Sequence, residues 1–132
     1  FKFINESYNA NPFSMISAIK NINFNYKKNR KFIFLGDMKE LGSKSIKLHR
    51  DLAKNINNSN IYKVFVYGTH IKETFNYISS EKKGKIFKNL DEAYNHFGKI
   101  LHNNDILMVK GSNATGLNKF SKNFKKGKVS AL

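Results

Sequence analysis

Residues 31–42 read KFIFLGDMKELG, an apolar run followed at once by a glycine and a polar loop. Four consecutive apolar residues, FIFL, are typical of a strand covered on both faces, as in a parallel sheet. Ligands of open parallel sheets bind beyond the carboxyl ends of the strands, in the loops that lead into the helices. This segment therefore predicts an α/β protein with a candidate site at the end of a central strand.

The same pattern extends in both directions along the chain. Further strand-like runs occupy residues 1–4, 62–67, 84–87 and 105–109. Between and after them, apolar residues recur at helical spacing, which predicts five helices packed on the sheet. The order βα repeated five times predicts a three-layer, Rossmann-like, doubly wound and mostly parallel sheet. The residues of the five apolar stripes are Met15, Ala18, Ile19, Ile22 and Tyr26; Leu48, Leu52, Ala53 and Ile56; Ile71, Phe75 and Ile78; Leu90, Ala93, Tyr94, Phe97 and Leu101; and Leu117, Phe120 and Phe124.

Two helix starts are marked by asparagine. Asn11 precedes Pro12, the only proline, which suits the first position of a helix. Asn89 stands three residues before Glu92, the spacing of a capping box. We therefore expect helices to begin directly after Asn11 and Asn89.

Composition limits the size and class of the protein. The chain has 132 residues, 40% of them hydrophobic, which suits a single domain over residues 1–132. It contains no cysteine, and its four histidines show no ligand spacing, so we expect no metal site. No apolar run is long enough for a membrane span and no signal segment opens the chain, so we expect a cytoplasmic location. Because Phe1 already belongs to a strand-like run, we expect the chain to be part of a longer protein.

The net charge of +15 has two possible interpretations, a nucleic-acid-binding site or a solvated basic surface. Only Arg30 and Arg50 are arginines, whereas specific nucleic-acid readers favour arginine for bidentate contacts. The lysines are scattered, with one denser cluster at residues 122–128. The pattern favours a solvated basic surface over a nucleic-acid site.

Three loops that follow predicted strands are candidate sites. They are residues 5–12 (NESYNANP), 36–42 (GDMKELG) and 110–116 (KGSNATG). The third loop has the glycine spacing of a phosphate loop but lacks the Lys-Ser/Thr pair that must follow, so it is no nucleotide P-loop. Backbone N–H groups at its helix start, with Lys110 and the Ser112 hydroxyl, would suit a carboxylate or phosphate. The alternative is a plain tight turn with a solvated Lys110.

The other two loops offer complementary chemistry. Asp37 can accept hydrogen bonds from an ammonium group, or it can instead bond the backbone of its own turn. Tyr8 offers a ring that can stack on a flat group, and Asn9 and Asn11 offer amide donors and acceptors. For Asn11 the alternative is a role as helix cap alone.

Together these motifs resemble the Mur ligases. SYNANP with Ser14-Met15, FLGDMKELG with His49 beyond it, and VKGSNATGL occur in the order of that family's C-terminal domain. The resemblance covers nearly the whole chain and is greatest to the members that join D-alanyl-D-alanine to UDP-N-acetylmuramoyl-tripeptide in peptidoglycan synthesis. Where those members usually carry acidic residues before Ser-Tyr-Asn, this chain has Asn5 and Glu6. Many members also have arginine at the position of Asn113.

The resemblance implies an ATP-dependent amide-bond ligase. ATP and Mg²⁺ would be bound mostly by a central ATPase domain, and UDP-N-acetylmuramoyl-tripeptide by an N-terminal domain, neither of which is in this chain. The chain alone would be inactive, and no catalytic residue is expected in it. Its share would be to bind D-alanyl-D-alanine and to close over the nucleotide. The resemblance implies Asp37, Lys110, Gly111 and Ser112 for the dipeptide and Tyr8, Asn9 and Asn11 for the nucleotide.

Two other functions remain open from the residues. The loop at residues 110–116 would serve a stand-alone α/β module that binds a small anion. The net charge would serve a basic nucleic-acid-binding protein. The ligase interpretation expects contact with missing ligase domains and no specific nucleic acid or membrane insertion.

Overall fold

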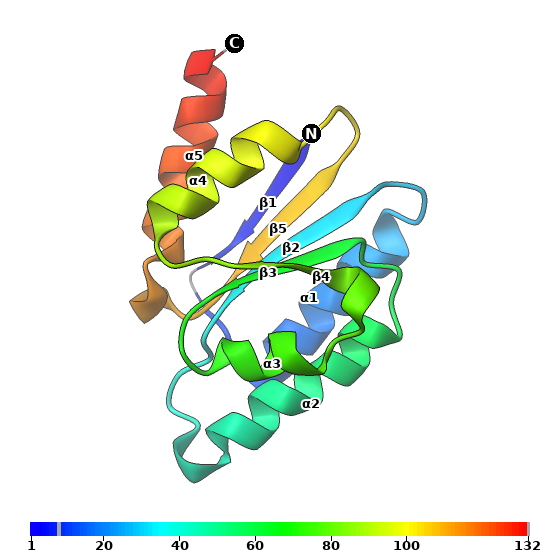
Figure 1. Ribbon diagram of the computed structural model, residues 1–132, viewed down its shortest axis with the longest axis vertical. Helices are drawn as coiled ribbons and strands as arrows, with labels where there is room; N and C mark the ends of the chain where they lie inside the picture. Colours follow the sequence, from blue (N-terminus) through cyan, green and yellow to red (C-terminus); the bar gives the residue numbers. More distant parts are fainter. Residues whose placement is uncertain (8, 132) are drawn as a thin grey trace.

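The sheet in the computed structural model has five strands, and all neighbouring strands pair in parallel (Figure 1). The structure describes residues 1–7 and 9–131, with side chains as far as Phe124. The strand order is β1-β5-β2-β3-β4. The expected doubly wound α/β sheet is confirmed, and it is parallel throughout rather than mostly so. The strands are β1 (Lys2–Glu6), β2 (Lys31–Gly36), β3 (Lys63–Tyr67), β4 (Lys83–Ile86) and β5 (Ile106–Lys110).

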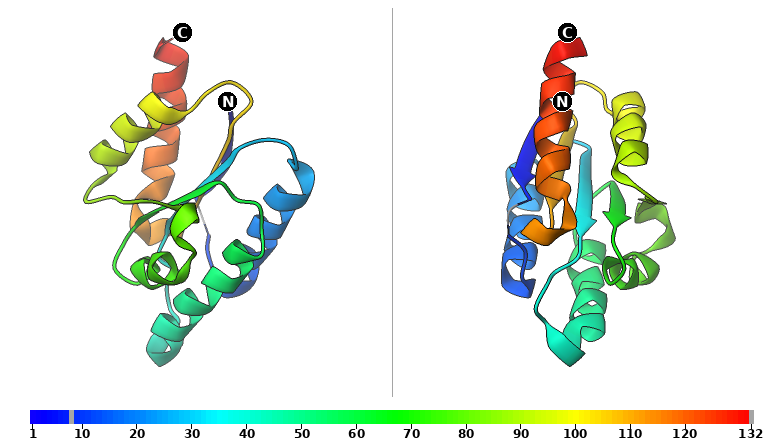
Figure 2. Two further views of the ribbon diagram at one scale, coloured as in Figure 1. Left: turned by 45° about the vertical axis from the view of Figure 1, so that its right-hand side comes forward. Right: turned by 90° about the vertical axis from the view of Figure 1, so that its left-hand side faces the viewer.

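Helices cover both faces of this sheet, as Figure 2 shows from two sides. α1 (Pro12–Asn25), α2 (Ser45–Asn57) and α3 (Ile71–Tyr77) pack on one face. α4 (Leu90–Ile100) and α5 (Leu117–Ala131) pack on the other. Three short 3₁₀ turns complete the chain: η1 (Gly42–Lys44), η2 (Ser80–Lys82) and η3 (Asn113–Thr115).

The two faces of the sheet have different cores. The α1–α3 side is aliphatic, with Ile33, Leu35 and Val64 of the strands packed against helix residues such as Leu52 and Ile56. The α4–α5 side is aromatic. Rings of Phe34, Phe65, Phe87, Phe97, Phe120 and Phe124 pack against one another there. The alternation of Ile and Leu with Phe in KFIFL places each type on its own face, as the period of two in a strand requires.

Both asparagine caps are present, with one difference from the expectation. Asn11 Oδ1 accepts the Ser14 N–H at 2.8 Å, and the Asn11 N–H donates to Ser14 Oγ at 3.0 Å, which makes a complete capping box. Asn89 Oδ1 accepts the Glu92 N–H at 2.8 Å. The Glu92 carboxylate, however, accepts from the Lys88 N–H rather than from Asn89. The second box therefore has its return bond one residue earlier than expected.

The carboxyl ends of β1, β5, β2 and β3 lie side by side at one edge of the sheet (Figure 1). The loops that follow these strands carry all three sequence motifs. At the other end of the sheet, Arg30 and Asp105 form an ion pair of 2.7 Å. None of the helices within the described part of the chain is both long and apolar enough to cross a membrane.

Candidate functional site at the carboxyl ends of the strands

Asp37 is the point at which three loops meet. It follows β2 directly, and its side chain is almost fully buried. Its Oδ1 accepts the N–H of Ile71 at the start of α3, at 2.8 Å. Its main-chain oxygen accepts the N–H of Ser112, at 3.0 Å. Asp37 therefore does not bond its own turn, as the alternative from sequence had it, but joins the ends of β2, β3 and β5.

Glycines permit this close approach. Gly68, which follows β3, has a φ of 143°, and a Cβ at this position would lie 2.4 Å from Asp37 Oδ1. Gly111 lies against Gly36, and a Cβ there would come within 2.7 Å of the Leu117 side chain. Any side chain at Gly68 would therefore displace the Asp37 carboxylate.

The buried Lys110 side chain connects two of the predicted loops, residues 5–12 and residues 110–116. Its Nζ donates to the main-chain oxygen of Asn9 at 2.9 Å. Burial lowers the pKa of Lys110, and the charge of Glu6, its register partner on β1, opposes that shift. The alternative of a solvated Lys110 in a plain turn is therefore not what the structure shows. Lys110 fixes the loop after β1 to the end of β5.

Ser112 has a free hydroxyl at the same place. Among the buried side-chain nitrogen and oxygen atoms that the structure describes, its Oγ is the one without a hydrogen-bond partner. The Ser112 main chain is occupied, because its N–H bonds Asp37 and its carbonyl accepts from Thr115 Oγ1 at 2.7 Å. An unpaired buried hydroxyl is costly, so it commonly marks a position that a ligand or water satisfies.

The structure describes two of the three residues that were predicted to contact the nucleotide. Tyr8 lies outside the described residues. Asn9 is exposed, and its carbonyl is held by Lys110. Asn11 acts as the helix cap, which uses its Oδ1. The structure thus brings Asp37 together with Ser112 and Asn9 together with Lys110, and it places these pairs on neighbouring strand ends.

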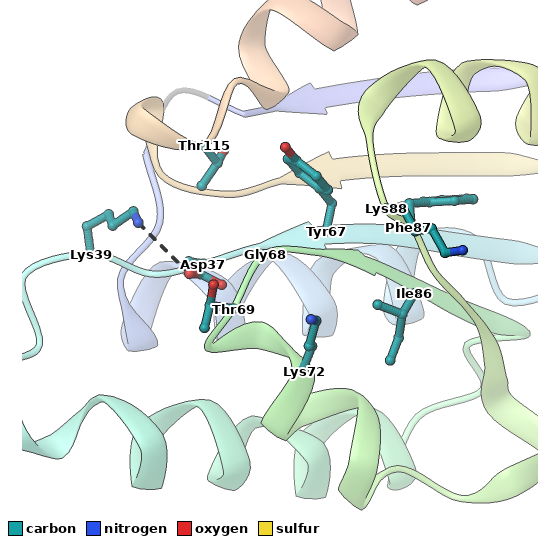
Figure 3. Close-up of a pocket in the computed structure, with 10 residues that line it drawn as sticks. All are labelled: Asp37, Lys39, Tyr67, Gly68, Thr69, Lys72, Ile86, Phe87, Lys88 and Thr115. Atoms are coloured by element: carbon teal, nitrogen blue, oxygen red, sulfur yellow. Dashed lines mark ion pairs between the residues drawn. The ribbon is translucent and has the colours of Figure 1, made fainter.

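A pocket of about 500 Å³ opens beside Asp37 (Figure 3). Asp37 is the one predicted site residue in its lining; Ser112 does not line the pocket, but its carbonyl accepts a hydrogen bond from Thr115, which does. Sequence reasoning singled out none of the other lining residues: two lie in the predicted loops after β2 and β5, and the rest lie in or after β3 and β4, where the loops carry no long motif. These residues are Lys39, Tyr67, Gly68, Thr69, Lys72, Ile86, Phe87, Lys88 and Thr115.

The pocket combines one negative group with three positive ones. Lys39 Nζ lies 3.9 Å from Asp37 Oδ2, a loose ion pair at the opening (Figure 3). Lys72 and Lys88 also line it, and across the described residues no carboxylate lies within ion-pair distance of either. Ile86 and Phe87 supply an apolar wall. The pocket therefore suits a small molecule with both an amine and a carboxylate.

A metal site does not emerge from the described residues. They contain no group of three or more His, Asp or Glu side chains that could hold an ion. His49 lies near Asp37 but bonds the backbone through both ring nitrogens, with the Met38 N–H at 2.9 Å and the Ser45 carbonyl at 2.8 Å.

Comparison with known proteins places this geometry in a family. Residues 1–113 match the family model described as "Mur ligase, glutamate ligase domain". The UDP-N-acetylmuramoyl-tripeptide–D-alanyl-D-alanine ligase of Buchnera aphidicola (subsp. Baizongia pistaciae) is 40% identical over 117 residues, covering 86% of this chain and 24% of that protein. The ligase of the same name from Rickettsia prowazekii is 29% identical over 118 residues, covering 89% and 26%.

Solved structures agree on the fold. The MurF ligase of Thermotoga maritima, in complex with ADP, superposes with a TM-score of 0.71 at 24% identity, over 91% of this chain and 28% of that one. MurF of Acinetobacter baumannii gives a TM-score of 0.73 at 22% identity, over 91% and 26%. The chain thus spans about a quarter of the length of these relatives. On the match over residues 1–113, the chain belongs to the Mur ligase family, through the glutamate ligase domain of that family.

Proposed function

We propose that this chain is the C-terminal domain, residues 1–132, of a longer ATP-dependent ligase that adds D-alanyl-D-alanine to UDP-N-acetylmuramoyl-tripeptide in peptidoglycan synthesis. Membership of the Mur ligase family supports a ligase. The names of relatives at 40% and 29% identity support these two substrates. Since the chain covers about a quarter of those proteins, its share would be substrate binding and closure rather than the whole reaction.

The observation that carries the proposal is the arrangement around Asp37. D-Alanyl-D-alanine has an amine at one end, a carboxylate at the other and two methyl groups between them. Asp37 would face the amine, while Ser112 Oγ and the Lys110-Gly111 segment would lie on the carboxylate side. Lys39, Lys72 and Lys88 add positive charge around the opening, and Ile86 and Phe87 would contact the methyl groups. A pocket of about 500 Å³ is within the range that small ligands occupy.

The loop after β1 would serve the nucleotide. Tyr8, Asn9 and Asn11 would lie near ATP, whose γ-phosphate activates the tripeptide carboxylate for attack by the dipeptide amine. The hydrogen bond from Lys110 to the Asn9 carbonyl ties this loop to the dipeptide side. Closure of the domain would then order both loops together and exclude water from the activated acyl group. Mg²⁺ would be held mostly by the central ATPase domain of the complete ligase.

Phosphate release by the complete gene product tests this proposal. With ATP, UDP-N-acetylmuramoyl-tripeptide and D-alanyl-D-alanine we expect steady release that stops when any one of the three is left out. Asp37→Asn should lower kcat/KM for the dipeptide about tenfold or more, because a neutral amide attracts the amine less. Asp91→Asn is the matched control, since Asp91 is exposed in the first turn of α4. Activity without dipeptide dependence would overturn the proposal.

The two other candidate functions predict different outcomes. A stand-alone anion-binding module would bind dipeptide or phosphate but gain no activity in a complete gene product. A nucleic-acid-binding protein would bind unrelated duplexes with a steep salt dependence. Either result, with the ligase assay silent, would replace the ligase interpretation.

A further inference from the structure

A buried histidine lies directly beneath the Asp37 loop. His49 of α2 has no exposed surface. Its Nε2 faces the backbone N–H of Met38, the residue after Asp37, at 2.9 Å. Because an N–H is a donor, Nε2 must be the acceptor, so it carries no proton. His49 Nδ1 then carries the ring proton and donates it to the Ser45 carbonyl at 2.8 Å.

A second set of contacts connects the same histidine to α3. Ser45 Oγ lies 3.3 Å from His49 Nδ1 and also bonds Nδ1 of His70, the residue before α3. Thr74 Oγ1 of α3 donates to the main-chain oxygen of His49. His70 directly precedes Ile71, whose N–H holds Asp37 Oδ1. One hydrogen-bond network between α2 and α3 therefore holds both the Met38 backbone, next to Asp37 in the chain, and the start of α3, where the Ile71 N–H binds the Asp37 carboxylate.

We propose that His49 is a positioning residue of the dipeptide pocket, which holds Asp37 in place through the Met38 N–H only while its ring is neutral. This inference rests on the proposed function for the identity of the ligand. A protonated His49 has donors at both nitrogens and no acceptor for Met38. The loop after β2 would then have to move, and Asp37 and Lys39 would move with it. The pocket would thus weaken as the pH falls.

Burial, a hydrogen bond and the charges that face His49 set the pH at which its ring is protonated. Asp37 and Lys39 face it from the loop after β2, and His70 faces it from the start of α3. Burial lowers the pKa of His49 below its ordinary value; the Ser45 carbonyl and Asp37 oppose this shift, and His70 and Lys39 add to it. The ring is therefore neutral at pH 7, and the loop is held. Half-protonation of the ring therefore requires a pH below the ordinary histidine pKa of about 6.5.

NMR of this 132-residue chain tests the positioning claim without any ligand. We expect the Met38 and Lys39 amide signals to shift between pH 8 and pH 5 in step with the His49 ring. His49→Gln supplies an uncharged acceptor at every pH, so it should abolish this shift while the Asp37 loop keeps its signals. His70→Gln and His96→Gln are the controls, the second because His96 lies on the opposite face of the sheet. A Met38 shift that persists in His49→Gln and vanishes in His70→Gln would overturn the inference.

Dipeptide binding tests the consequence. As the pH falls from 7.5 through the titration of the His49 ring that the NMR series records, the affinity of the wild-type chain for D-alanyl-D-alanine should fall at least fivefold. The affinity of His49→Gln should stay level, and that of His49→Leu should be low throughout. A merely structural role would lower affinity in both variants at all pH values and leave the slope unchanged, which would contradict the inference. Failure of the wild type to bind at any pH would count against the proposed function, while the Met38 titration decides the role of His49 separately.

Discussion

At the scale of single residues, Ser112 and Asp37 define the site through their hydrogen bonding. Ser112 contributes a buried hydroxyl without a partner, and Asp37 a carboxylate that accepts the Ile71 N–H, while its main-chain oxygen accepts the Ser112 N–H. Groups of this kind are retained at a cost to stability when they serve binding. Stability and affinity should therefore respond in opposite directions to substitution at Ser112.

Ser112→Ala should leave the free energy of unfolding unchanged or raise it by up to about 1 kcal/mol, because no hydrogen bond is lost. The same change should weaken dipeptide binding about tenfold, or ~1.4 kcal/mol. Ser121→Ala is the matched control, since the Ser121 hydroxyl is buried but bonds Ser7 Oγ at 3.1 Å. We expect that control to lose about 1 kcal/mol in denaturant unfolding and to keep its affinity. Equal stability losses in both variants would contradict the account of Ser112.

Gly68→Ala should displace the Asp37 carboxylate, because the added Cβ would lie 2.4 Å from Oδ1 in a backbone conformation with φ of 143°. We expect a loss of about 1–3 kcal/mol in unfolding free energy and a loss of dipeptide affinity. Gly98→Ala in α4, where a Cβ meets nothing within 4 Å, should instead gain about 0.5–1 kcal/mol. Thermal unfolding and calorimetric titration of both variants measure these changes. A Gly68→Ala variant with wild-type stability and wild-type dipeptide affinity would show that the added Cβ does not displace Asp37.

The sequence pointed to Asp37, Lys110 and Ser112, but it could not supply their partners. Asp37 bonds Ile71 across 34 positions of the chain, and Lys110 bonds Asn9 across 101. Such contacts depend on which strands become neighbours, and no local pattern encodes that. Lys72 and Lys88 were missed for another reason. In a lysine-rich chain, an exposed lysine near a strand end looks like any other until the pocket is seen.

At the scale of elements, each predicted strand and helix is present, with ends shifted by a few residues. The strand predicted at residues 1–4 is β1 at Lys2–Glu6, and the one predicted at 105–109 is β5 at Ile106–Lys110. Strand order could not be derived, because β5 enters between β1 and β2 although it is last in the chain. The expectation of strands covered on both faces fails at β4, an edge strand in which Gly84 and Lys85 are exposed.

Asn11 has two assigned roles, cap of α1 and contact to the nucleotide, and they separate at the scale of the element. Asn11→Ala and Asn89→Ala each remove one side-chain cap, so each should cost about 1 kcal/mol in unfolding free energy. Only Asn11→Ala should also raise the KM for ATP of the complete ligase. If the two variants have equal KM values for ATP, Asn11 acts only as the cap of α1.

At the scale of the whole molecule, titration of the buried His49 and the partly buried His96 links folding to pH. Burial lowers the pKa of both His49 and His96. The unfolded chain therefore takes up protons before the folded chain does, as the pH falls from about 6.5 toward the lowered values. The free energy of unfolding should decrease through this window and level off below it. In urea unfolding at pH 7.5 to 5, His49→Gln should show a smaller decrease than wild type; an identical decrease would exclude His49 as a source.

The central claim is that the strand ends around Asp37 form a binding site for D-alanyl-D-alanine. The most direct measurement is an amide-resolved NMR titration of this chain with millimolar D-alanyl-D-alanine, with L-alanyl-L-alanine and a DNA duplex as parallel samples. The account predicts shifts for D-alanyl-D-alanine at residues 36–42, 67–72 and 110–116, weaker ones for the L-dipeptide and none there for DNA. Dipeptide shifts confined to other segments, or salt-sensitive DNA shifts with these loops silent, would contradict it.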